Sequence, residues 1–301
     1  MTCKDILKFL RAEFHLRNFL FHHNDYKPLT CSPWLPGGMW QLVFVVYRWF
    51  VSLYFLAWLV PSGIHNSNGG PKYFIFLTNW AFLLFNSYLL VSAISVTLQF
   101  FIHYTYVNQD LSRHDLFVKR NNLNGKEKMV RVLLGADYTM EVVWYQKIQW
   151  LLETIGLEAA IAIPILYWSV VYSSGDELDG VNLNTHLVNG IVALFDVWFS
   201  GIIIRLYHVV YVVAVGATYS VFSGIYYAAD GTNAKGEPYI YSSLDYGDEL
   251  GQAIVLLVLT VLVFLPLVHL VMFAMYGIRY WLAKKACRRK REHNDETVEQ
   301  I

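Results

Sequence analysis

The stretch YFIFLTNWAFLLFNSYLLVSAISVTLQFFI, residues 73–102, decides the fold class because it contains no charged side chain. About 20 apolar residues at 1.5 Å each are enough to cross the roughly 30 Å hydrocarbon core of a bilayer. A segment this long and this apolar is typical of a transmembrane helix that is tilted or extends beyond the membrane.

The composition extends this prediction to the whole chain. Hydrophobic residues make up 56 % of the 301 residues, charged residues make up 15 %, and the mean hydropathy is +0.37. A soluble domain usually carries about 25 % charged residues. The 23 basic and 23 acidic residues cancel, which argues against a nucleic-acid partner held by net positive charge. The sequence therefore predicts an all-α integral membrane protein whose main partner is the lipid bilayer.

Six segments are long and apolar enough to span a membrane. They are residues 41–60, 73–102, 148–172, 186–204, 206–228 and 252–276. Pro61 ends the first segment, and Arg205 separates the fourth from the fifth. We therefore expect six transmembrane helices.

The basic residues predict the orientation of these helices. Lysine and arginine gather before the first span, in residues 104–147 and after the sixth span, whereas the opposite loops contain only Lys72 and Lys235. Cytosolic loops of membrane proteins carry an excess of basic residues, so both termini are expected in the cytosol.

This orientation predicts three regions. Residues 1–39 form a cytosolic N-terminal region, residues 40–278 the six-helix transmembrane domain, and residues 279–301 a basic and then acidic cytosolic tail. Residues 4–21 have the pattern of a basic amphipathic helix, which either lies on the cytosolic leaflet or packs against the bundle.

The motifs of several membrane enzymes are absent from the sequence. There are no repeated histidine clusters of the di-iron type, no His-Glu-x-x-His and no Gly-x-Ser-x-Gly. The three cysteines are too scattered for a zinc site. The sequence predicts no metal and no cofactor.

Charged residues inside the predicted spans indicate a buried cluster. Arg48 lies about 12 Å from one end of its span, and Glu158 and Asp196 lie about 15 Å from an end of theirs, so all three fall near the midplane. Because an unpaired charge there costs several kcal/mol, Arg48 is expected to pair with Glu158, Asp196 or both. Such a cluster either fixes the helix register or lines a proton or substrate path. Glu153, nearer the edge, is expected to be hydrated.

A second constellation joins the starts of two predicted spans. Thr78 opens the second span, and His186 and Asn189, three residues apart on one helix face, open the fourth. A base beside a hydroxyl is the minimum for nucleophilic catalysis. The alternative is that Thr78 bonds its own helix backbone and His186 meets lipid headgroups.

Small residues recur every four positions in the fifth predicted span, at Gly216, Ser220 and Gly224. Such a stripe permits close helix contact. The contact lies either within the bundle or between two copies of the chain in a homo-oligomer.

Short motifs, taken in order, resemble those of the rolling stone family of animal multi-pass membrane proteins. The motifs are Cys31-Ser32-Pro33-Trp34, Tyr47-Arg48-Trp49, Lys72-Tyr73-Phe74 with Thr78-Asn79-Trp80, and His186-Leu187-Val188-Asn189 followed by Asp196. The resemblance covers residues 25–280. It implies a role in membrane or cell fusion of the kind seen in myoblasts, and a location in the plasma membrane rather than the endoplasmic reticulum.

A fainter resemblance links the chain to the androgen-induced membrane hydrolases, which cleave long-chain fatty-acid esters. Thr78 matches the position of that family's threonine nucleophile, and His186 matches the first histidine of its Asn-His-x-x-His-Thr pattern. Asn189 stands where the second, catalytic histidine would be, and an asparagine cannot act as a general base. The resemblance implies a lipid-ester hydrolase only if His186 takes over that role.

Overall fold

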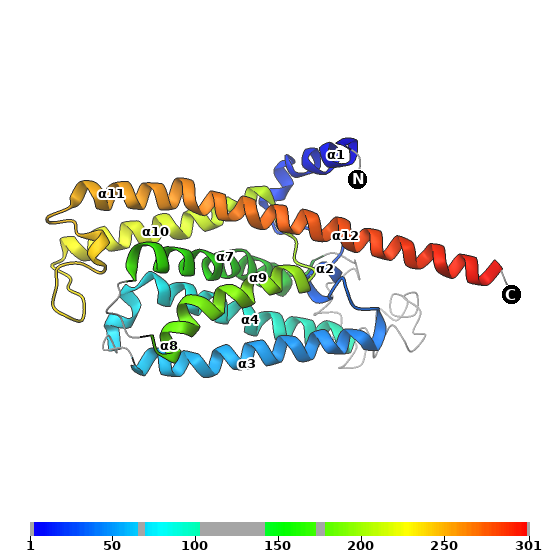
Figure 1. The fold of residues 1–301 in the computed structure, drawn as a ribbon, viewed down its shortest axis with the longest axis horizontal. Helices are drawn as coiled ribbons and strands as arrows, with labels where there is room; N and C mark the ends of the chain where they lie inside the picture. The colour runs from blue at the N-terminus through cyan, green and yellow to red at the C-terminus, as the bar shows by residue number, and fades with distance from the viewer. Residues whose placement is uncertain (1–2, 66–69, 103–141, 173–177, 300–301) are drawn as a thin grey trace, which may run out of the picture.

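The computed structural model describes residues 3–65, 70–102, 142–172 and 178–299, and all regular structure within these ranges is helical. The helices form an elongated bundle (Figure 1). Both described chain ends lie at one end of this bundle, which we call the terminal end, and the opposite end is the distal end.

Five helical stretches are long and apolar enough to cross a membrane: Gly38–Ile64, Leu77–Phe101, Trp144–Val171, Leu206–Ala228 and Leu250–Ala286. They contain α3 (Gln41–His65), α4 (Leu77–Ile102), α7 (Trp144–Leu166), α10 (Val209–Ala228), α11 (Leu250–Leu259) and most of α12 (Leu265–Glu299). Since α4 packs against both α3 and α7, it lies near the centre of one half of the bundle. The prediction of an all-α, multi-pass membrane architecture is confirmed.

The fourth predicted span is not one of these five helices. Residues 180–199 instead form α8 (Gly180–Leu183), a π-helical segment η6 (Asn184–Val188) and the short α9 (Asn189–Phe199). Three asparagines, Asn182, Asn184 and Asn189, make this run more polar than the five long helices. The run nevertheless returns from the distal end toward the terminal end, beside α7 (Figure 1).

The observed helix boundaries differ from the predicted ones at three places. Pro61 lies inside α3, which continues to His65, because a proline in a membrane helix can be accommodated by its neighbours. A 3₁₀ segment, η3 (Gly70–Ile75), precedes α4, so the second span begins at Leu77 rather than at residue 73. The last helix continues to Glu299, well beyond residue 276, with a π segment η9 (Thr260–Phe264) in its middle.

The N-terminal region packs onto the bundle. The predicted helix over 4–21 is shorter, consisting of α1 (Cys3–Glu13) and a separate 3₁₀ turn, η1 (Leu16–Phe19). After α2 (Lys27–Thr30), Ser32 Oγ donates a hydrogen bond of 2.6 Å to the carbonyl of Phe199. Leu29 is 2 % exposed and belongs to the main hydrophobic core. The helix α1 also contacts the bundle, because Phe9 stacks on Phe273 and Tyr280 of α12 at 5.7 and 5.9 Å between ring centres.

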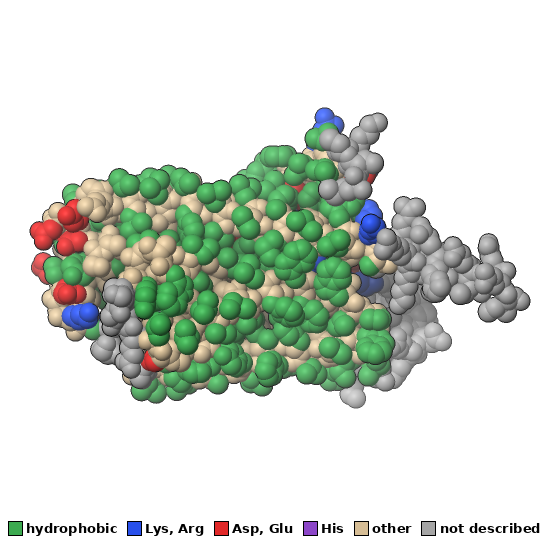
Figure 2. Space-filling model, viewed as in Figure 1, with side chains coloured by type: hydrophobic (Ala, Val, Ile, Leu, Met, Phe, Trp, Pro, Cys, Tyr) green, Lys and Arg blue, Asp and Glu red, His purple; other side chains and the backbone are tan. Residues whose placement is uncertain are grey.

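Side chains of different kinds cover the middle and the ends of the molecule. Hydrophobic side chains cover the middle of the visible face, and acidic side chains gather at the distal end (Figure 2). The distal acidic residues are Asp179, Asp230, Glu237, Asp245, Asp248 and Glu249. The middle of the bundle therefore has the surface of a protein that is surrounded by lipid.

Candidate functional site

The first polar site is an ion pair between α3 and α9. Arg48 Nη1 lies 2.8 Å from Asp196 Oδ2, and the two side chains are 1 % and 0 % exposed. Tyr88 on α4 bridges them, because its hydroxyl accepts a 2.8 Å hydrogen bond from Arg48 and donates one to Asp196. Tyr47 donates a further hydrogen bond of 3.0 Å to Asp196 Oδ1. Asp196 thus has three donors from two other helices.

The surroundings of Arg48 explain how a charge is kept inside the bundle. Its guanidinium lies 4.8 Å from the centre of the Phe44 ring, one helical turn earlier on α3. The negative face of an aromatic ring attracts a cation, and this attraction is stronger where water is excluded. A buried pair of this kind is weak evidence for net stability, but breaking it leaves an uncompensated charge. Of the two partners open to Arg48, the structure shows Asp196.

Arg279, on α12, binds the C-terminal end of α9. It is 2 % exposed, and its guanidinium donates to the carbonyls of Val197 and Ser200 at 2.5 Å and to that of Ile202. A cation at a helix C-terminus is favoured by the helix dipole and satisfies carbonyls that have no partner in the helix. From the sequence, Arg279 was expected in the basic tail, and no pattern indicated this role.

Glu158 belongs to a different pair. Its Oε2 lies 2.7 Å from Nδ1 of His269, whose Nε2 lies 2.9 Å from the carbonyl oxygen of Arg205. Because that carbonyl only accepts, Nε2 carries a proton, and a second proton is shared between Nδ1 and the carboxyl group. The possible pairing of Arg48 with Glu158 is not found. The signal for the true partner was a histidine in the last predicted span.

Glu153 is buried, contrary to the expectation that it is hydrated. Its side chain is 1 % exposed, and neither carboxylate oxygen has a hydrogen-bond partner among the described residues. The charges that act on it belong to Arg48, Asp196 and Arg279. The expectation failed because α7 begins at Trp144, so Glu153 lies about two and a half turns inside the helix rather than at its edge.

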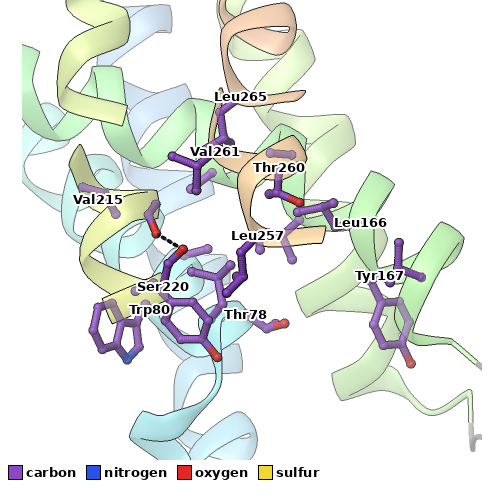
Figure 3. Close-up of a pocket in the computed structure, with 18 of the residues that line it drawn as sticks. Thr78, Trp80, Leu166, Tyr167, Val215, Ser220, Leu257, Thr260, Val261 and Leu265 are labelled. Carbon is purple, nitrogen blue, oxygen red and sulfur yellow. Dashed lines mark hydrogen bonds between the residues drawn. The ribbon is translucent and has the colours of Figure 1, made fainter. Parts of the chain in front are cut away.

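Thr78 lines an apolar cavity near the distal end. It lies in the first turn of α4, is half-buried and points into the cavity (Figure 3). The phenol of Tyr241, from the loop between α10 and α11, interacts with Thr78. Burial raises the pKa of Tyr241 above its ordinary value, and the interaction with Thr78 acts in the opposite direction. Thr78 and Tyr241 thus line the same cavity.

His186 and Asn189 contact other groups. The His186 ring stacks on Tyr167 at 3.5 Å between ring centres, and its Nδ1 has no hydrogen-bond partner among the described residues. Asn189 is 1 % exposed, and its Oδ1 accepts a 2.8 Å hydrogen bond from the backbone N–H of Gly190. No hydrogen bond among the described residues joins Thr78 to either residue, and neither lines the cavity. The structure does not bring the three together as a catalytic dyad with its orienting group.

The stripe of small residues on α10 is divided between two environments. A Cβ atom on Gly216 would lie 2.7 Å from Leu265 Cδ1, so this glycine permits α10 to approach α12 closely. Ser220 lines the cavity and donates 2.9 Å to the carbonyl of Gly216. A Cβ on Gly224 would meet nothing within 4 Å. The close contact at Gly216 is therefore within the chain.

Comparison with known proteins gives one family. The sequence profile of the family described as "Protein rolling stone" matches residues 2–120 and 127–289. The protein rolling stone of Drosophila melanogaster is 25 % identical over 247 residues, which are 81 % of this chain and 81 % of the fly protein. No solved structure matches the chain significantly.

Proposed function

Because the chain belongs to the rolling stone family, we propose that it acts in a fusion-type event between cell membranes, such as myoblast fusion. The match to that family over most of the chain is the observation that carries this proposal. A protein of cell–cell fusion has to reach the cell surface, so the proposed location is the plasma membrane rather than the endoplasmic reticulum.

The proposed orientation has both termini in the cytosol, with six passes through the membrane. The distal end, with its acidic residues and only two lysines, Lys72 and Lys235, would then face outward. This orientation makes the distal loops the part of the chain available to another cell. Single cysteines at exposed distal positions such as Ala234 and Ser242 should react with an impermeant thiol reagent on intact cells. Labelling of a cysteine near Lys284, and not of these two, would invert the topology.

A non-enzymatic role is supported by how the buried polar groups are used. Arg48, Asp196 and Arg279 tie α3, α4 and α12 to the last turn of α9 and to the loop that follows it. Such pairs fix the relative positions of helices in lipid, where the hydrophobic effect does not act between them. The bundle is thereby suited to holding the distal loops in one arrangement.

A fusion assay with two cell populations tests the proposal. Myoblasts that lack the protein should form fewer multinucleated cells, and re-expression of the parent chain should restore content mixing. The variant Asp196→Ala, brought to the same surface level as the parent, should restore less content mixing because α9 loses its ion pair with Arg48. Equal content mixing with and without the protein would contradict a role in fusion.

The second candidate function is a hydrolase of long-chain lipid esters, and Thr78 at an apolar cavity is the observation that favours it. In this proposal Thr78 is the nucleophile, and His186, which does not line the cavity in this structure, is the base. Asn189 then either orients the imidazole or donates to the oxyanion. Purified protein should then hydrolyse fatty-acid esters, and both Thr78→Ala and His186→Gln should abolish the activity. Activity that survives Thr78→Ala would exclude this mechanism, and Asn189→His tests whether a missing base limits it.

A further inference from the structure

The cavity that Thr78 lines is a slot within the bundle. It has a volume of about 120 Å³ and lies between α4, α7 with its π segment η5 (Tyr167–Val171), α10 and the α11–η9–α12 helix. Its walls follow α7 and η5 from Ile155 to Val171, a distance of about 24 Å at 1.5 Å per residue. The space is thus narrow and elongated along the direction of the helices.

Two π-helical segments contribute residues to the walls of this slot. Tyr167, Val170 and Val171 come from η5, and Thr260 and Val261 come from η9 (Figure 3). A π turn contains an extra residue, widens the helix and is frequently found at functional sites. Pro266 contributes to the irregularity of η9, because it cannot donate a backbone hydrogen bond to Leu262 inside that segment, whereas η5 itself contains no glycine or proline. Both π-helical segments, η5 and η9, therefore line the same slot.

The lining determines which chemistry the slot accepts. None of its residues carries a charge, and most are Leu, Val, Ile or Ala. An apolar cavity stays free of water but accepts hydrocarbon. A carboxylate or a phosphate would be left without a cation, at a high cost in free energy. The occupant is therefore neutral and mainly hydrocarbon.

Hydroxyl groups gather at the distal end of the slot. Thr78 opens α4, and Tyr241 and Ser243 come from the distal loop before α11. These groups both donate and accept hydrogen bonds, as alcohol or ester oxygens require. On the side, Val170 is exposed, while Leu166 and Leu257 are half-buried, so the slot opens toward the apolar outer surface of the bundle.

We propose that this slot binds the acyl chain of a neutral, single-chain lipid of the monoacylglycerol class, with its hydroxyl-bearing head against Thr78 and Tyr241. The chain enters sideways from the lipid, between η5 and α11. Binding alone is proposed, with no bond made or broken, and it does not rest on the fusion or the hydrolase proposal.

Photo-crosslinking in phosphatidylcholine nanodiscs tests this site. The probe is an ether-linked monoalkylglycerol, which cannot be hydrolysed, with a diazirine in the middle of its chain and a terminal alkyne. Peptide mapping should place the adducts in η5, η9 and the facing turns of α7. Unlabelled monoacylglycerol should remove these adducts, whereas a fatty acid of the same chain length should not.

Two variants of equal added size locate the chain. Ala159→Phe places a ring in the slot, and Ala214→Phe places the same ring on the exposed face of α10. Excluding about two methylene groups from the slot should weaken probe binding roughly tenfold in the first variant and leave the second unchanged. A double variant, Thr78→Val with Tyr241→Phe, should remove the preference for the glycerol head over a methyl ether.

Three outcomes would overturn the proposal. Adducts spread over outward-facing residues of α3 and α12, undiminished by the competitor, would mean general contact with lipid. Equal competition by the fatty acid would refute the neutral head. Equal labelling of Ala159→Phe and Ala214→Phe would refute the slot as the site, and if Ala159→Phe does not fold, the competition experiment on the parent chain still decides.

Discussion

Breaking the Arg48–Asp196 pair should destabilise the bundle far more than removing both charges together. In Arg48→Ala the Asp196 carboxylate keeps the hydroxyls of Tyr88 and Tyr47 but loses the guanidinium that lies 2.8 Å from it. Loss of one partner of a buried pair costs about 3–5 kcal/mol. Asp196→Ala should cost a similar amount, because Arg48 is then left with the Tyr88 hydroxyl and with an Nε that has no partner.

The double variant distinguishes this reasoning from simple loss of packing. Arg48→Met with Asp196→Leu replaces both charges by apolar groups and should unfold within about 1–2 kcal/mol of the parent, or be more stable. The free energies come from reversible unfolding by SDS in mixed micelles. Tyr47→Phe, which removes one hydrogen bond to a charge, should cost about 1.5–3 kcal/mol. If the double variant loses the sum of the two single losses, the residues are not coupled and the argument is wrong.

Three further changes test other parts of the bundle. Gly156→Ala should destabilise the protein by about 1–3 kcal/mol, because its Cβ would lie 2.9 Å from the carbonyl oxygen of Leu84. Gly224→Ala, whose Cβ would lie in open space, should stabilise α10 by about 0.5–1 kcal/mol. Unfolding in SDS measures both free energies, and equal effects would contradict close packing of α4 against α7. Glu153→Met should be neutral or stabilising by up to about 3 kcal/mol, because it removes two buried oxygens that have no hydrogen-bond partner among the described residues. Glu158→Met should cost about 1–3 kcal/mol, because His269 then loses its hydrogen-bond partner. A larger loss of stability in Glu153→Met than in Glu158→Met would show that Glu153 has a partner. Burial raises the pKa of the Cys31 thiol above its ordinary value, so with the other cysteines replaced by serine its alkylation rate should still be rising at the pH where that of a free thiol levels off. A rate that levels off at the same pH as that of a free thiol, or at a lower one, would refute this.

The class of the fold follows from the sequence because the bilayer imposes it. An uncharged run such as residues 73–102 can be satisfied in lipid only as a helix, so its neighbours on the chain hardly matter. The fourth span shows the limit of this reasoning. Its asparagines are hidden by α7 and α3, as Asn184 is by the Tyr54 hydroxyl that donates to it, and only tertiary contacts make such a polar run tolerable.

The site could be predicted only in part for a similar reason. Depth along each helix was enough to bring Arg48 and Asp196 to the same level, but rotation about the helix axis decides which charges meet. Glu158 is at that level too, yet it faces His269 on another helix. Thr78 and His186 likewise open helices at the same end of the bundle but point to different neighbours.

The docking of the N-terminal region has a consequence for synthesis. Ser32 bonds to a carbonyl 167 residues later, and Trp34 bonds to one 164 residues later, at Trp198. At about 5–20 residues per second a ribosome needs roughly 10–30 s to make that interval. During this time the region has left the ribosome but its receptor, the end of α9, does not yet exist. The N-terminal region can therefore dock only after residue 199 has been synthesised, so its packing onto the bundle is a late step of assembly.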